Sequence, residues 1–76
     1  MLEEKIELLY NTIIERQHQW DEYVKLFGED HTLTKGIFNS LEGLEEAFKI
    51  LSGRTFTAVL LERVRNNIDA LSAMVS

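Results

Sequence analysis

The feature that most constrains the fold is a helical period of apolar residues, which runs along the whole chain and is interrupted twice. Apolar residues recur at steps of three and four, the spacing that places side chains on one face of a helix. No stretch alternates with a period of two, and there is no proline. Gly28 and Gly53 each follow an apolar run, and glycine ends helices because it adopts the left-handed conformation without a Cβ penalty. The sequence therefore predicts an all-α chain with helices over residues 2–27, 32–52 and 56–75.

The second predicted helix has the widest apolar stripe and is expected to be central. The stripe consists of Leu33, Ile37, Leu41, Leu44, Phe48 and Leu51. A row of small residues beside it, called the small-residue row below, repeats the same rhythm: Gly36, Ser40, Gly43 and Ala47. Glycine inside a helix costs about 1 kcal/mol relative to alanine, so this row predicts close approach of another backbone, with a kink at Gly36 as the alternative. Gly43→Leu is then expected to overpack that contact and to destabilise the protein by roughly 1 to 3 kcal/mol.

The outer two predicted helices are also amphipathic. The stripe of the first helix consists of Leu2, Ile6, Leu9, Ile13, Trp20, Tyr23 and Phe27, and that of the third consists of Leu60, Val64, Ile68, Leu71 and Val75. The first helix is the longest and is expected to overhang the others. Short connections between amphipathic helices predict an antiparallel three-helix bundle that forms a single domain over residues 1–76. The same pattern also suits a helical hairpin that completes its core with a second copy.

The connection between the first two helices carries a short motif, Phe27-Gly28-Glu29-Asp30 with Thr34 four residues after Asp30. It resembles a junction found in short, uncharacterised bacterial and phage helical proteins, although His31 stands where a serine is common. The resemblance implies a turn between two helices and no activity. Asp30 or Thr32 is expected to cap the second helix, and His31 is expected to face solvent.

Composition narrows the range of functions. The 76 residues carry a formal net charge of -5, and only the last third of the chain is basic. Because nucleic-acid affinity depends on lysine and arginine, no nucleic-acid partner is expected. No apolar run approaches the roughly 20 residues that cross a bilayer, so no membrane association is expected either. The absence of cysteine and the acidic start, which lacks the basic flank of a secretory signal, predict a cytoplasmic protein.

One group of residues has the spacing of metal ligands. Glu15 and His18 form an E-x-x-H pair, and Glu22 follows one turn later, as in helices that bind di-iron centres. These side chains point away from the apolar stripe, so we interpret them as a solvated face and expect no metal or cofactor. A surface site completed by another molecule would favour zinc. No nucleophile signature or glycine-rich phosphate loop is present, so no enzymatic activity is expected.

In addition to the small-residue row, three side chains are candidates for an interface. Leu8 points away from the first stripe, Gln17 interrupts that stripe, and Phe38 lies about 100° from the second stripe. Trp20, on the stripe itself, is expected to be in the core. Antiparallel pairing of two first helices would bring Gln17 close to its own symmetry mate and predicts a homodimer.

The leading functional hypothesis is a non-enzymatic helical module that self-associates and binds a protein partner, as a regulator or an accessory protein of a mobile element. The alternative is an acidic decoy that mimics nucleic acid and blocks the binding site of another protein. A decoy would need its acids on one face, whereas lysines and arginines are interspersed among the acids of this chain. A surface metal binder through Glu15, His18 and Glu22 is a third reading.

Overall fold

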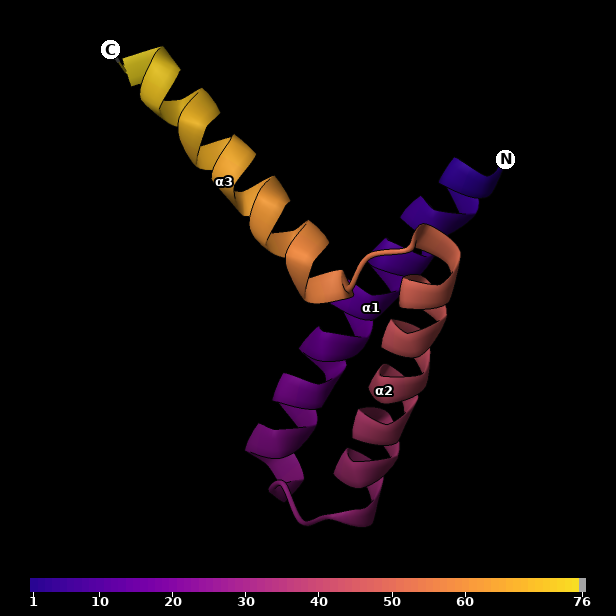
Figure 1. Cartoon of the computed structure of the whole chain (residues 1–76). Helices are drawn as coiled ribbons and strands as arrows, with labels where there is room; N and C mark the ends of the chain where they lie inside the picture. Colours follow the sequence, from indigo (N-terminus) through magenta and orange to yellow (C-terminus); the bar gives the residue numbers. More distant parts are fainter. Residues whose placement is uncertain (76) are drawn as a thin grey trace.

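The computed structural model describes residues 1–75 and contains three helices, with no strand in that range. They are α1 (Leu2–Phe27), α2 (Thr32–Ser52) and α3 (Phe56–Val75). Figure 1 shows α1 and α2 lying side by side as an antiparallel hairpin, while α3 starts against this hairpin and then projects away from it. The predicted all-α, three-helix fold is confirmed, with packing that is much more extensive between α1 and α2 than between α2 and α3.

Glycines end the first two helices, as the sequence predicts. Gly28 has φ 88°, and its N–H donates to the carbonyl of Val24 over 2.9 Å. Gly53 has φ 75° and donates in the same way to Lys49, also over 2.9 Å. Both backbones occupy the positive-φ region that an L side chain disfavours, so glycine is needed at each position.

The start of α2 differs from the prediction. Its cap is His31, not Asp30 or Thr32: Nδ1 of the imidazole accepts a hydrogen bond of 3.2 Å from the N–H of Leu33. The ring also stacks on Phe27, with centroids 4.8 Å apart and planes 29° apart. The histidine therefore ties the end of α1 to the start of α2, and this bond requires an unprotonated Nδ1.

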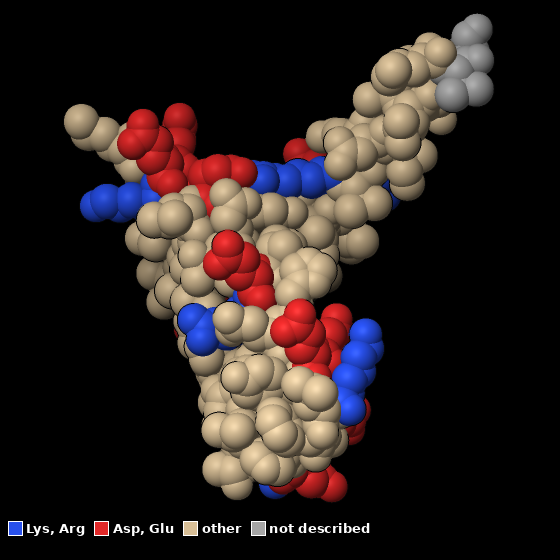
Figure 2. All heavy atoms as spheres, turned by 180° about the vertical axis from the view of Figure 1, so that it is seen from behind, with Lys and Arg blue, Asp and Glu red and all other residues tan. Residues whose placement is uncertain are grey.

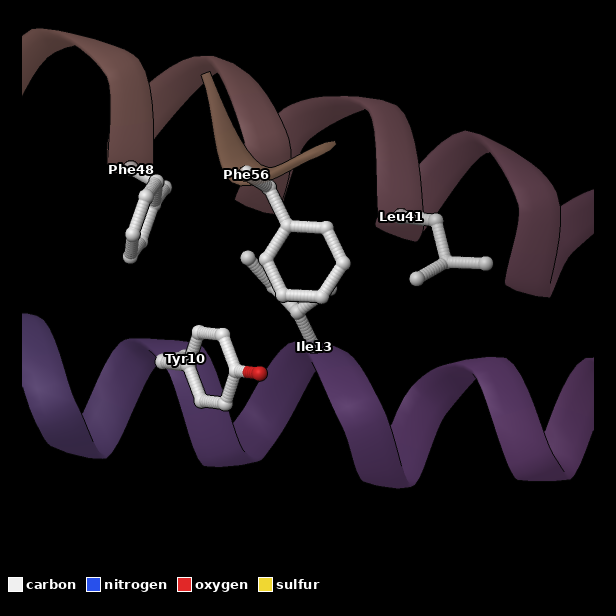
Figure 3. Close-up of a cluster of buried hydrophobic side chains, with 5 residues drawn as sticks. All are labelled: Tyr10, Ile13, Leu41, Phe48 and Phe56. Carbon is white, nitrogen blue, oxygen red and sulfur yellow. The ribbon is translucent and has the colours of Figure 1, made fainter. Parts of the chain in front are cut away.

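The hydrophobic core lies where all three helices meet. It consists of Tyr10, Ile13, Leu41, Phe48 and Phe56. Figure 3 shows Phe56, the first residue of α3, inserted between the two helices of the hairpin. Its ring centroid lies 5.2 Å from that of Tyr10 and 5.9 Å from that of Phe48. These distances are typical of aromatic pairs, so a three-ring cluster holds α3 to the hairpin.

The buried face of α2 is turned relative to the predicted stripe. Thr34, Leu41 and Phe48 are buried, whereas Leu33 and Leu51 are exposed. On a helical wheel this turns the buried face by about 50° away from the small-residue row. Thr34 is accommodated because its hydroxyl lies within 3.5 Å of the carbonyl of Tyr23, to which it donates.

The predicted close approach at the small-residue row is wrong for the helices of this chain. A Cβ atom built on Gly36 or Gly43 would have no neighbouring heavy atom within 4 Å. Ser40 and Ala47 are only partly buried. Since α1 packs on a different face of α2, Gly43→Leu would overpack no contact seen in this chain, and neither glycine has a positive φ.

The molecule is extended for its size. Its radius of gyration is 15.1 Å and its principal extents are 47 × 31 × 17 Å. A compact protein of this length would have a radius of gyration of about 11 Å. The projecting α3 accounts for the difference. Within the described residues, no helix combines the length and the apolar character of a membrane span.

Candidate functional site

The connection between α2 and α3 is braced by side-chain hydrogen bonds. The hydroxyl of Ser52 donates to the carbonyl of Phe48 over 2.7 Å and accepts from the N–H of Arg54 over 3.1 Å. Thr55 caps α3, because its hydroxyl oxygen accepts from the N–H of Ala58 over 3.2 Å. The bracing fixes where α3 begins.

One arginine links α3 to α1. Arg63 donates two hydrogen bonds to the carboxylate of Glu7 on α1, of 2.8 and 2.6 Å. Its guanidinium carbon also lies 4.0 Å from the ring centroid of Tyr10. The hydrogen bonds from Arg63 lower the pKa of Glu7, and the same bonds raise the pKa of Arg63. Glu7 precedes Tyr10 on α1, so this pair directs α3 toward the amino-terminal end of that helix.

Along α3, several large apolar side chains are exposed. We use the name α3 apolar face for its exposed members: Leu61, Val64, Ile68, Leu71 and Met74. Ile68 is 57% exposed and Leu71 is 61% exposed, although the sequence places both in a buried stripe. Figure 2 shows the projecting helix almost free of charged side chains on the face in view. The predicted burial of this stripe within one chain is therefore wrong for these residues; the side chain of Val75 lies outside the described residues.

A groove runs between α1 and α2 on the part of the hairpin that α3 leaves uncovered. Its residues, called the hairpin groove below, are Gln17, Trp20, Asp21, Phe38, Leu41, Glu42 and Glu45. The rings of Trp20 and Phe38 form its aromatic wall, with centroids 6.4 Å apart. Leu41 belongs both to this groove and to the core around Phe56. The groove therefore continues the seam that Phe56 fills at the other end.

The structure separates the interface residues that the sequence singled out. Gln17 and Phe38 come together in the hairpin groove, where Phe38 is 48% exposed. Leu8 is 68% exposed and does not line the groove. The small-residue row is absent from the groove as well. Trp20, expected in the core, is half-buried at the groove wall.

Sequence reasoning missed that α3 offers an exposed apolar surface. Its residues were recognised as apolar from their spacing, but helical spacing alone does not reveal what covers a stripe. The basic balance of residues 53–76 amounts to one net charge, and Arg54 and Arg63 already pair with acids of this chain, so the charge pattern did not reveal this surface.

The remaining charged groups are dispersed. Glu15, His18 and Glu22 are all exposed on α1. Among residues 1–75, no three histidine, aspartate or glutamate side chains lie together in a way that would hold a metal ion. On the face in Figure 2, blue lysines and arginines are interspersed among red acids over the hairpin.

Comparison with models of protein families, with curated proteins and with solved structures finds no match to this chain. The functional assignment therefore rests on the α3 apolar face and the hairpin groove.

Proposed function

We propose that the protein is a non-enzymatic helical interaction module that self-associates and acts by binding a protein partner. The observation that carries this proposal is the α3 apolar face. Monomeric proteins rarely expose a contiguous apolar patch of more than a few hundred Å², and larger patches mark interaction sites. The five large apolar side chains of this face lie along one helix, and each is at least 45% exposed.

The exposed surface of the chain supports an interface of ordinary size. The molecule exposes 5940 Å². A compact protein of 8.8 kDa would expose about 4,800 Å². The excess of about 1,100 Å² is more than the roughly 800 Å² per partner that a standard specific interface buries. A second chain that covered this excess would bring each copy to the exposure expected of a compact protein.

The electrostatics favour binding over catalysis. Glu7 and Arg63 have displaced pKa values, and each is displaced mainly by its hydrogen bonds to the other. Both lie at the surface, where they position α3, rather than in a cleft that would tune an acid or a base. An acidic decoy is supported less well, because a nucleic-acid mimic needs an unbroken acidic face, and on the face in Figure 2 lysines and arginines are interspersed among the acids.

Light scattering after size exclusion tests the self-association directly. At tens of micromolar we expect a species of twice the 8.8 kDa chain mass, which dissociates on dilution. A species of 8.8 kDa at every concentration, with a cooperative melt, would contradict self-association. The protein partner would then have to be sought by pull-down from the native host, and binding through the α3 apolar face would be expected.

A further inference from the structure

We infer that a second copy of this chain occupies the hairpin groove: the α3 apolar face of each copy lies in the groove of the other. This inference rests on the proposed self-association and specifies its two surfaces. Each chain then donates one helix and accepts one helix, so that the pairing is reciprocal and closes as a two-fold dimer.

The two surfaces match in chemistry. The centre of the α3 apolar face is aliphatic, with Val64, Ile68 and Leu71 on successive turns. At the wall of the groove, Trp20 presents a partly buried aromatic ring and Phe38 presents one that is 48% exposed. A helix laid in the groove would cover both sets, as apolar helix faces do in grooves of other proteins. The seam already accepts an α3 residue, since Phe56 fills its far end.

The charges at the edges of the two surfaces also match. Asp21, Glu42 and Glu45 lie along the groove and give it an acidic rim. On α3, Arg65 lies about 100° from the centre of the apolar face, which places it at the edge of that face. Docking would bring this arginine to the acidic rim, where opposite charges favour the orientation.

The structure disfavours the occupant that is closest in sequence, the α3 of the same chain. With Phe56 held at Tyr10, α3 could enter its own groove only by running toward Trp20, that is, down α1. Arg63 would then move by about 10 Å along α1, at 1.5 Å per residue, away from Tyr10 toward Trp20. Glu7 lies on the opposite side of Tyr10, so closure within one chain would break both the Arg63–Glu7 pair and the Arg63–Tyr10 contact. A second copy fills the groove and leaves both contacts in place.

Cross-linking between two single-cysteine variants locates the contact. The chain has no native cysteine, so Glu42→Cys reports the groove rim and Ile68→Cys reports the α3 apolar face. Equal amounts of the two variants, mixed and treated with a short bismaleimide, should give mainly the mixed Glu42→Cys–Ile68→Cys product. A dominant product between two Ile68→Cys chains would show pairing of α3 with α3, which overturns the inference and leaves self-association standing. In the double variant, a dominant link within one chain would show closure of α3 onto its own groove and would also overturn it.

A charge placed on the α3 apolar face gives the second test. Ile68→Glu should weaken the dimer by roughly a hundredfold, because docking would bury an unpaired carboxylate. Asn66→Glu, on the opposite side of the same helix, is the matched control and should leave the dimer intact. Ile68 is exposed in the single chain, so circular dichroism should show both variants folded.

The only tryptophan supplies an independent readout, because Trp20 lines the groove. Its emission should shift to the blue as the wild-type protein dimerises and should not shift with concentration in Ile68→Glu. A dimer that persists unchanged in Ile68→Glu would overturn the inference while self-association stands. A wild-type protein that remains monomeric would refute both.

Discussion

The two kinds of glycine in this chain should respond in opposite directions to the same substitution. Gly43 lies inside α2 with an ordinary helical backbone, and a Cβ atom there would meet nothing within 4 Å. Gly43→Ala should therefore stabilise the protein by about 0.8 to 1 kcal/mol, the helix-propensity difference between the two residues. Gly53 has the same open space around it but a φ of 75°, so Gly53→Ala should cost about 1 to 2 kcal/mol of left-handed strain.

Thermal melts by circular dichroism at one fixed protein concentration measure both effects. For a domain of this size, 1 kcal/mol moves Tm by about 4 to 8 °C, so the variants should move apart on either side of the wild type. A fixed concentration is needed because dimerisation makes Tm concentration-dependent. A lower Tm for Gly43→Ala would refute the reasoning and would show that the small-residue row meets another copy at close range.

Three other predictions concern a buried ring, an ion pair and the binding of zinc. Phe56→Ala should lower the free energy of unfolding by about 3 to 5 kcal/mol, because Phe56 is buried, and Phe38→Ala should cost less in a denaturant melt of the single chain. Glu7 has a lowered pKa in the folded state, so its pairing with Arg63 stabilises the fold above the ordinary glutamate pKa and is lost as the pH falls through the lowered value. The Tm of Glu7→Gln should thus lie below that of the wild type at neutral pH and coincide with it in strong acid; a constant difference would contradict the pairing. Excess zinc should leave Tm unchanged, and a rise that disappears in His18→Ala would contradict that expectation.

The helices and their ends were predictable because they are set by local chemistry. Apolar spacing identifies the three helices, and Gly28 and Gly53 end the first two through their own backbone conformation. The cap of α2 was not predictable in the same way. His31 accepts the hydrogen bond because its ring is held against Phe27, and the preferred cap residues on either side of it do not displace it.

The small-residue row shows where local reasoning about packing ends. Gly36 and Gly43 do lower the stability of the helix relative to alanine. To infer a close contact from this penalty, however, is to assume that another helix lies on the small-residue side of α2. The face of α2 that packs against α1 is instead the one that carries the larger residues Leu41 and Phe48, with Thr34 buried on the same face. Which face of a helix is buried depends on the partner helix, and the partner's position is not encoded in the period of one helix.

The proposed dimer contact lies on α3 and the hairpin groove, whereas the sequence predicted pairing of two first helices. The length of α1 suggests an apolar overhang on that helix, and Leu2 at its start is indeed exposed. Ile6 and Leu9 pack against the core, however, while Ile68 and Leu71 on α3 stay exposed. An amphipathic period predicts that one face of a helix will be covered, but it does not predict which chain covers that face. Closure of α3 onto the groove of its own chain would break one polar contact, the double hydrogen bond from Arg63 to Glu7. If that contact is what keeps the groove open, removing it should favour closure of α3 within one chain at the expense of the proposed dimer.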